Sequence, residues 1–297
     1  MTIEEAPADD HWLEIIEPGA LSKLGDVRHA VFDFDGTISV IRQGWEDVMA
    51  PLMVEMICGN TDPTEEIDAE VREYVDRSTG ILTIKQMEWL AEAVRRHGLA
   101  RDPKTALEYK HIYNERLLVP VRDRLDRLAR GECTQMDLAI TGARQFIRAL
   151  YARGVEMYLT SGTDEVYVLE EARALGVAEF FDGRIYGARD DTQFYTKERI
   201  IQRILSEHHL QGQQLLVVGD GPVEIRNAVA REALSLGVAS DEVRRFGWNT
   251  RKRRRLLNAG VDLLVADFRQ HESLLRFLCD FPVGAMDETK RTNEGCA

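Results

Sequence analysis

The sequence predicts an α/β protein in which a doubly wound parallel sheet carries an inserted all-helical segment. Short apolar, β-favouring runs alternate with amphipathic helical patterns over most of the chain. This alternation is typical of a parallel sheet that helices cover on both faces. Between the first apolar run and the next, about a hundred residues show helical periodicity alone, which indicates an insertion rather than a continuation of the sheet.

The first predicted strand covers residues 28–32 and ends in the polar loop Asp33-Phe34-Asp35-Gly36-Thr37. Apolar runs predict further buried strands, and amphipathic patterns predict the helices between them. The predicted strands are 155–160, 215–218, 234–239 and 261–266, and the predicted helices are 142–153, 164–175 and 197–208.

The predicted insertion begins with apolar side chains spaced three and four residues apart from Trp45 to Ile57. Similar patterns recur over 67–75, 84–94 and 109–117, and glycines stand where these helices could end. We therefore expect a discontinuous α/β domain, a helical domain between its two parts, and a loose polar tail. The expected boundaries are 1–39 with 138–286, then 40–137, and 287–297.

The composition narrows the possible partners. The 297 residues can bury a sizeable core without disulfide or metal cross-links. The 38 Lys+Arg and 51 Asp+Glu give a net charge of −13, which disfavours binding to nucleic acid or to an acidic membrane but still allows a small phosphorylated metabolite. No apolar run approaches the ~20 residues of a membrane span, so we expect a cytoplasmic protein. A monomer and a homodimer both remain open.

Three groups of residues could be taken for binding sites, but a structural role explains each of them more simply. The four cysteines lack metal-ligand or disulfide spacing, so we interpret them as reduced packing residues. The basic run 251–255 has no interleaved aromatics and is interpreted as the solvated face of a helix. His208 and His209 follow a predicted helix, and we interpret them as partners of its dipole rather than metal ligands.

Polar side chains follow three of the predicted strands. Asp33 and Asp35 follow the first strand, residues 160–163 the second and residues 219–224 the third, while Lys197 opens the helix before the third strand. The carboxyl ends of strands in a doubly wound sheet open onto one crevice, where ligands bind. We therefore expect three acids, a hydroxyl and a lysine to converge there.

This set resembles the phosphatase branch of the haloacid dehalogenase superfamily, with its Rossmann-like core and helical C1-type cap. Members similar in this respect include phosphoglycolate phosphatase and beta-phosphoglucomutase. Asp33-Phe34-Asp35-Gly36-Thr37 matches the DxDGT motif of that family, and the other motifs follow in the family's order. The resemblance covers the α/β portion, about two thirds of the chain, and implies that residues 40–137 are the cap.

The chemistry of phosphate esters requires the same residue types. A catalyst must neutralise charge, align a nucleophile and protonate a poor leaving oxygen. Asp33 can accept the phosphoryl group as an aspartyl-phosphate, and Asp35 can protonate the leaving alcohol and then deprotonate water. The resemblance assigns these two residues the same roles.

Two carboxylates beside a phosphate need a cation, and oxygen ligands alone favour Mg²⁺. The resemblance implies that Asp33, the Asp35 backbone carbonyl and Asp220 hold the metal. Glu224 stands where the family usually has Asp, so it could bind the metal directly or through water.

The resemblance also implies a phosphate-binding set. Lys197 would hold Asp33 and offset the phosphate charge, and Ser161 would donate to a phosphate oxygen, as would backbone amides near Gly36 and Gly162. Thr160 is an alternative to Ser161, because the family's second motif ends in either Ser or Thr.

The resulting hypothesis is a Mg²⁺-dependent phosphomonoester hydrolase that acts on a small phosphorylated metabolite. Arg42, Gln43 and Lys85 in the insertion are candidates for contact with the leaving group. Three alternatives remain: a phosphomutase on the same core, a phosphonatase that uses Lys85 in a Schiff base, and a non-enzymatic interaction protein.

Overall fold

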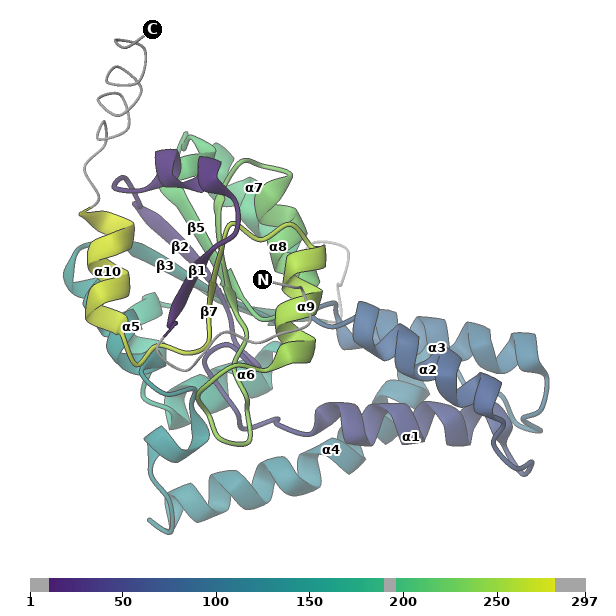
Figure 1. The fold of residues 1–297 in the computed structure, drawn as a ribbon. Coiled ribbons are helices and arrows are strands. Elements are labelled where there is room, and N and C mark those ends of the chain that lie inside the picture. The colour runs from purple at the N-terminus through teal and green to yellow at the C-terminus, as the bar shows by residue number, and fades with distance from the viewer. Residues whose placement is uncertain (1–10, 190–195, 281–297) are drawn as a thin grey trace, which may run out of the picture.

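The computed structural model describes residues 11–189 and 196–280, and its centre is a seven-stranded sheet (Figure 1). The strand order is β1-β7-β6-β5-β2-β3-β4, and every neighbouring pair is parallel except β1 with β7. The strands are β1 (Leu13–Ile15), β2 (His29–Asp33), β3 (Glu156–Asp164), β4 (Ile185–Ala188), β5 (Leu215–Gly219), β6 (Leu234–Val238) and β7 (Leu263–Val265).

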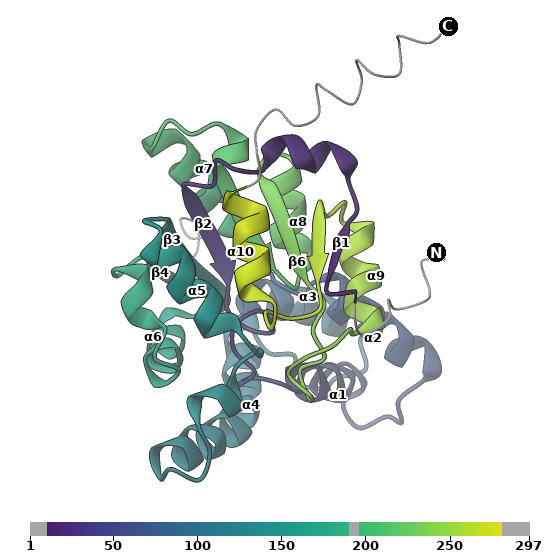
Figure 2. The same ribbon diagram turned by 60° about the vertical axis from the view of Figure 1, so that its left-hand side comes forward.

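Helices cover both faces of this sheet, as the alternation of apolar runs and helical patterns predicts. Successive strand residues point to opposite faces, so Phe32 packs in the cluster that includes α5 and α10, whereas Val31 packs against α7 and α8. Figure 2 shows α10 and α8 on opposite sides of the sheet. The helices are α5 (Ala143–Ala152), α6 (Glu165–Ala174), α7 (Lys197–Glu207), α8 (Pro222–Val229), α9 (Thr250–Asn258) and α10 (His271–Cys279). The predicted doubly wound fold with a helical insertion is confirmed.

Four helices between β2 and α5 lie together beside the sheet (Figure 1). They are α1 (Trp45–Cys58), α2 (Glu65–Arg77), α3 (Thr83–His97) and α4 (Ala106–Ala129). The chain enters and leaves this group at one place, because the Val40 amide donates to the Leu138 carbonyl and the Ile140 amide to the Ile38 carbonyl, each at 2.9 Å. The helical segment is thus joined to the sheet by two adjacent chain segments.

Local signals explain where these helices begin and end. The Thr64 side chain caps α2, and Thr105 with Glu108 forms a capping box at the start of α4. Gly98 ends α3 in the left-handed conformation that glycine adopts without strain. Pro51 lies inside α1, which continues through it to Cys58.

The basic run on α9 differs from its prediction as a solvated face. Lys252, Arg253 and Arg255 are buried, and only Arg251 and Arg254 remain exposed. Because α9 packs against β6 and α8, one side of the helix must face the protein interior. The long side chains on that side meet carboxylates there: Arg253, for example, pairs with Glu14 at 2.9 Å.

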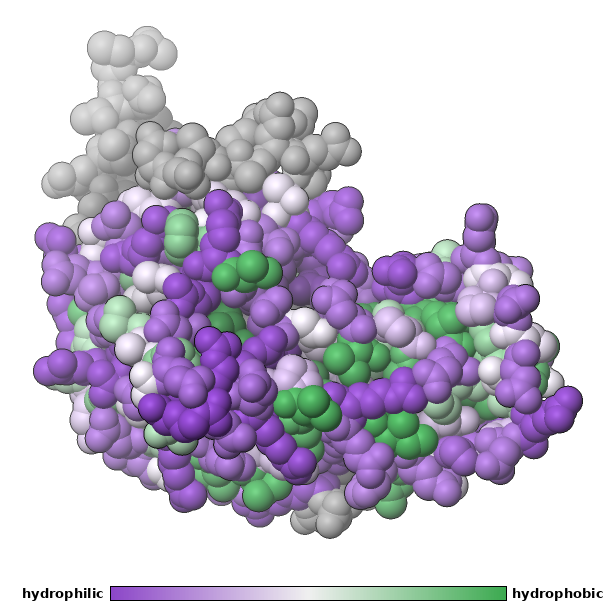
Figure 3. Space-filling view, turned by 90° about the horizontal axis from the view of Figure 1, so that it is seen from below, coloured by the Kyte–Doolittle hydropathy of each residue, from purple (hydrophilic) through white to green (hydrophobic). Residues whose placement is uncertain are grey.

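The surface agrees with the acidic, polar composition. The face seen in Figure 3 is mostly hydrophilic, with hydrophobic side chains in separate groups. Within the described residues, no helix combines the length and the apolar character needed to cross a bilayer. Cys58, Cys133 and Cys279 are free thiols, as expected. The predicted tail at 287–297, with Cys296, lies outside the described residues.

Candidate active site

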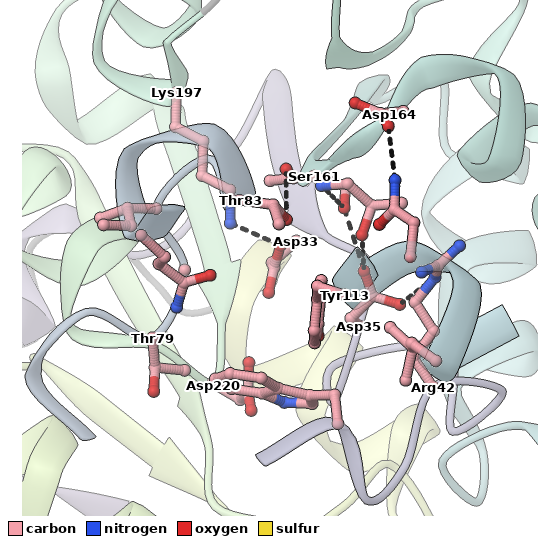
Figure 4. Close-up of a pocket in the computed structure, with 18 residues that line it drawn as sticks. Asp33, Asp35, Arg42, Thr79, Thr83, Tyr113, Ser161, Asp164, Lys197 and Asp220 are labelled. Carbon is pink, nitrogen blue, oxygen red and sulfur yellow. Dashed lines mark hydrogen bonds and ion pairs between the residues drawn. The ribbon is translucent and has the colours of Figure 1, made fainter. Parts of the chain in front are cut away.

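A cavity of about 70 Å³ lies at the carboxyl ends of β2, β3 and β5, between the sheet and the inserted helices (Figure 4). The residues that line it from the α/β part include Asp33, Asp35, Ser161, Gly162, Lys197 and Asp220. These residues come from three strand ends and the start of α7, so the crevice expected from the sequence exists and brings them together. Glu224 does not line the cavity but lies directly behind Lys197.

Asp33 and Lys197 form the buried ion pair at the centre of this cavity. Lys197 Nζ donates to Asp33 Oδ1 at 2.6 Å, and both side chains are about 5% exposed. Lys197 also pairs with Glu224 Oε1, so Lys197 is held between two carboxylates. Burial, together with the nearby carboxylates of Asp220 and Asp35, raises the pKa of Asp33 to about 7 despite the attraction of Lys197. Negative charge at this site is therefore only partly compensated.

Asp35 has one carboxylate oxygen fixed by hydrogen bonds and one that accepts no hydrogen bond from the described residues. The hydroxyls of Ser161 and Thr163 donate to Asp35 Oδ2 at 3.0 and 3.1 Å. Asp35 Oδ1 is buried, and no described residue forms a hydrogen bond with it. Thr160, the alternative to Ser161, instead donates its hydroxyl to the Phe32 carbonyl at 3.2 Å within the sheet.

Asp220 lies against a glycine and a second lysine. Lys252 Nζ is 2.7 Å from Asp220 Oδ2 and 2.6 Å from Glu242 Oε1, and all three side chains are largely buried. A Cβ at Gly36 would collide with Asp220 Oδ2 and lie 2.9 Å from Lys252 Nζ. Although burial works in the opposite direction, Lys252 and Arg255 lower the pKa of Asp220. Gly36 thus leaves room for the Asp220 side chain at the rim of the cavity, and Lys252 keeps that side chain ionised.

The predicted amide of Gly36 is not available to a phosphate in this structure. The Gly36 N–H donates to the Ser39 carbonyl at 2.8 Å, inside the turn that follows β2. Gly36 adopts a φ of +76°, which glycine tolerates without strain. Gly36 therefore provides space for the side chains of Asp220 and Lys252 and does not donate a hydrogen bond to the substrate.

The donors at the cavity fit a hard divalent cation. Asp33 and Asp220 offer buried carboxylate oxygens, and no histidine or cysteine lines the cavity among the described residues. Oxygen-only sets of this kind suit Mg²⁺. Burial contributes most to the raised pKa of Asp33, and the neighbouring Asp220 and Asp35 add to it, so a cation here would meet several carboxylates. Glu224, also predicted as a ligand, has Oε1 on Lys197 and a buried Oε2 with no hydrogen-bond partner.

The segment between α2 and α3 closes one side of the cavity. A Cβ at Gly162 would collide with the Ile81 carbonyl oxygen, and one at Gly221 would lie 3.3 Å from the Thr79 carbonyl oxygen. Arg255 also donates to Thr79 Oγ1 at 2.9 Å, which joins α9 to this segment. The two glycines let the inserted helices approach the strand ends closely.

The three candidates for contact with the leaving group lie in different surroundings. Arg42 lines the cavity, but its guanidinium binds Glu171 with hydrogen bonds of 2.6 and 3.0 Å and lies 3.9 Å from Asp35. Gln43 does not line this cavity and instead lines two surface hollows beside the insertion. Lys85 is half exposed and pairs with Glu88 one turn along α3. The prediction that Gln43 and Lys85 contact the leaving group is therefore wrong for this structure, because neither residue lines the cavity.

Sequence reasoning missed several residues around the cavity, notably Lys252, Glu171 and Tyr113. Tyr113 lines the cavity from α4, and burial raises its pKa well above the ordinary value. A signal for Lys252 did exist: a helix that packs on a sheet must bury one side, and positions 252, 253, 255 and 256 fall on such a side. The sequence contains no local signal for the pairing of Arg42 with Glu171.

A family model described as haloacid dehalogenase-like hydrolase matches residues 27–230. The search of curated proteins found no match. Three of the similar solved structures are a predicted phosphatase from Clostridium acetobutylicum, a predicted phosphoglycolate phosphatase from Haemophilus somnus and a beta-phosphoglucomutase from Clostridium difficile.

The likeness to these structures is broad but distant. Their sequence identities are 16%, 14% and 15%, and their TM-scores are 0.54, 0.57 and 0.56. The matches cover 84%, 84% and 86% of this chain and 99%, 98% and 98% of the other chains. At such identities the comparison shows a shared fold, with the inserted helices included in the matched length.

Proposed function

The chain belongs to the haloacid dehalogenase-like hydrolases, and on that premise we propose that it is a Mg²⁺-dependent phosphatase of a small phosphorylated metabolite, acting through an aspartyl-phosphate on Asp33. The observation that carries this proposal is the buried Asp33 carboxylate in the cavity, held by Lys197 at 2.6 Å next to an Asp35 oxygen that accepts no hydrogen bond within the described part of the chain. The inserted segment 40–137 acts as the cap over the cavity.

Asp33 is the nucleophile in this proposal. Lys197 fixes Oδ1 of Asp33, so the carboxylate has one orientation when a phosphoryl group approaches. Lys197 also offsets the charge of the phosphate, and Glu224 keeps the lysine in place. Because a covalent aspartyl-phosphate divides hydrolysis into two steps, each step has a lower barrier than direct attack by water.

Asp35 is the acid and base. The hydroxyls of Ser161 and Thr163 hold Oδ2 of Asp35, which leaves Oδ1 to carry the proton to the leaving oxygen. The same oxygen then takes a proton from the water that attacks the aspartyl-phosphate. Ser161, rather than Thr160, is the hydroxyl assigned to the phosphate, because Ser161 lines the cavity and Thr160 does not. Ser161 would exchange its hydrogen bond to Asp35 for one to a phosphate oxygen, and Thr163 would still hold Asp35.

Asp33, Asp220 and the backbone carbonyl of Asp35 would hold Mg²⁺, which would neutralise the phosphate charge during transfer. The chain contributes the low-exposure setting of these groups and the cap that excludes water. Arg42 is assigned a positioning role, because Glu171 holds its guanidinium beside Asp35. A phosphomutase would use the same residues and would differ in the fate of the phosphoryl group.

The test is phosphate release from p-nitrophenyl phosphate and a panel of phosphometabolites. We expect turnover with Mg²⁺, loss of turnover with a chelator and recovery when Mg²⁺ is restored. Asp33→Asn should lower kcat at least about 1000-fold because the nucleophile is lost, with an unchanged circular dichroism spectrum. Asp102→Asn, at an exposed site on the cap, is the matched control and should keep normal turnover.

Retention of more than about a tenth of kcat by Asp33→Asn would reject Asp33 as nucleophile. Phosphorylated product in place of inorganic phosphate would favour the phosphomutase. An absence of turnover on every ester, in protein that is folded and supplied with Mg²⁺, would reject the phosphatase.

A further inference from the structure

A second group of ligand-type side chains lies at the edge of the sheet opposite the cavity. His29 begins β2 and Glu156 begins β3, whereas Asp33 and Ser161 lie toward the other ends of these strands. His29 and Glu156 are register partners in the parallel β2–β3 pair. His208 directly follows α7, whose first residue is Lys197. The group is thus separated from the cavity by the length of a strand and of a helix.

The pleat of the sheet explains why the three side chains meet. Val31 and Tyr158 lie on the sheet face that α7 covers. Side chains two residues apart share a face, so His29 and Glu156 point to the same side as Val31 and Tyr158. The end of α7 brings His208 over them, with 4.4 Å between the centres of the two imidazole rings. One donor atom from each of the three residues lies within 4.8 Å of the other two.

The surroundings keep these donors suited to a metal ion. His29 is buried at the base of the group, with the ring of His208 directly beside it. The Tyr158 hydroxyl lies 2.9 Å from Nε2 of His208 and 3.4 Å from Nδ1 of His29. Tyr158 thus contacts both imidazoles and helps to orient the two rings.

The carboxylate of the group is accessible. The Glu156 side chain is 45% exposed, and its cationic neighbour Arg184 lies 3.9 Å away, which is a loose contact. His208 is also exposed, whereas His29 forms the buried base of the group. An ion can therefore enter from solvent without a rearrangement of the sheet.

We propose that His29, Glu156 and His208 bind one divalent ion of the Zn²⁺ class, with water as the remaining ligand. Two imidazoles and one carboxylate form a donor set that Zn²⁺ and its neighbours in the transition series favour over Mg²⁺. The oxygen-only cavity has the opposite preference, so the two sites select different metals. The ion links the end of α7 to the first residues of β2 and β3, and so fixes the helix that carries Lys197 at its other end.

The test measures Co²⁺ and Zn²⁺ binding to the full chain in the presence of excess Mg²⁺, which occupies the cavity. Co²⁺ is followed by its visible absorption and by titration calorimetry. We expect one Co²⁺ per wild-type chain, and a loss of affinity of more than about 100-fold in His208→Ala. His209→Ala is the matched control, because the neighbouring His209 is exposed and outside the group. It should bind as the wild type does.

Two further variants separate ligation from folding. Glu156→Gln keeps the shape of the side chain and should weaken Co²⁺ binding, whereas Tyr158→Phe should weaken it about 10- to 100-fold, as loss of an outer hydrogen bond does. Saturating Zn²⁺ should raise the Tm of the wild type and of His209→Ala by a few degrees, and that of His208→Ala by much less. The proposal is overturned if the wild type binds no Co²⁺, or if His208→Ala and His209→Ala bind it equally well.

Discussion

Burial decides what each charged side chain near the cavity does. Lys252 lies in a run of five basic residues, yet it is the buried cation between Asp220 and Glu242. Burial opposes the charge on Lys252, but the two carboxylates outweigh it and raise its pKa above the ordinary value. A lysine of this kind holds Asp220 in place and keeps it ionised before any metal binds.

Replacement of Lys252 by methionine should expose its electrostatic role. The change removes the lysine that forms an ion pair with both Asp220 and Glu242, and loss of one partner of a buried pair costs about 3–5 kcal/mol of unfolding free energy. Mg²⁺ bound at Asp220 would restore part of this loss. Urea denaturation without Mg²⁺ should therefore show a large destabilisation, and Mg²⁺ should raise the Tm of Lys252→Met more than that of the wild type.

The control for this prediction is Arg254→Met, which changes an exposed neighbour on the same helix and should stay within about 0.5 kcal/mol of the wild type. Equal destabilisation by both variants would contradict the role of Lys252. So would an equal effect of Mg²⁺ on Lys252→Met and the wild type.

Glu171 should make stability depend on pH. Burial raises its pKa from 4.5 to about 7, although Arg42 opposes the shift. The folded protein therefore holds the Glu171 proton more tightly than the unfolded chain does. Since the unfolded chain releases this proton first, the unfolding free energy falls as pH rises from about 4.5 to 7, by roughly 3 kcal/mol.

Urea denaturation at a series of pH values, with a chelator present, measures this dependence. Glu171→Gln cannot release the proton and should have a flatter profile between pH 5 and 7 than the wild type. Glu170→Gln, at the exposed neighbouring position, should keep the wild-type slope. Parallel profiles for the wild type and Glu171→Gln would show that the Glu171 carboxyl does not cause the pH dependence of the unfolding free energy.

Among the secondary-structure elements, the segment between α2 and α3 can contact the strand ends closely because a glycine, which has no side chain, stands at the contact. Gly162 follows the buried part of β3, and an added Cβ there would collide with the Ile81 carbonyl oxygen. The backbone of Gly162 does not occupy the left-handed region, so alanine would be strained only through this contact. The close approach of the cap segment therefore requires a residue without a side chain at position 162.

Gly162→Ala should move the α2–α3 segment away from the cavity. A displacement of about 1 Å near reacting groups can lower a rate by up to ~10²-fold, so we expect kcat/KM for p-nitrophenyl phosphate to fall about 10- to 100-fold. Gly19→Ala is the control, since its Cβ would meet only the flexible Glu17 side chain at 3.3 Å. Unchanged kcat/KM in Gly162→Ala would mean that this contact does not position the cap.

At the scale of the whole molecule, the insertion and the sheet share one apolar core. A single cluster of buried side chains includes Met53 of α1, Leu90 of α3 and Leu118 of α4 together with Phe32 of β2 and Phe146 of α5. The helical segment therefore buries part of its apolar surface against the α/β part. A shared core of this kind favours unfolding as one cooperative unit.

The four tryptophans allow this cooperativity to be measured. Trp45 and Trp89 belong to the inserted helices, whereas Trp12 and Trp248 lie in the α/β part. Fluorescence of Trp12→Phe/Trp248→Phe reports on the insertion, and that of Trp45→Phe/Trp89→Phe reports on the sheet. Within each double variant, the urea midpoint from fluorescence should equal the midpoint from far-UV circular dichroism. Separate midpoints would show that the two parts unfold independently.

Features that depend on local patterns could be predicted from the sequence. Alternating apolar runs and helical periodicity predicted a parallel sheet between two layers of helices, and the helical insertion. This was possible because hydrophobic spacing reports directly on which face of an element is buried. The edge strand β1 and the short β4 gave no comparable signal, since each has only three or four residues. Asp33, Asp35, Ser161, Lys197 and Asp220 could be grouped because parallel strands end at one edge.

Which charged side chains meet depends on contacts between distant segments of the folded chain. Arg42 pairs with Glu171 from 129 positions away, and Lys252 reaches Asp220 from a helix whose buried side is set by packing on β6. The tertiary structure also placed Lys85 outside the cavity and gave the Gly36 amide to Ser39. The physical reason is that a partner for a long charged side chain depends on helix rotation and strand register across distant segments. These quantities leave no periodic trace in the sequence near the residue itself.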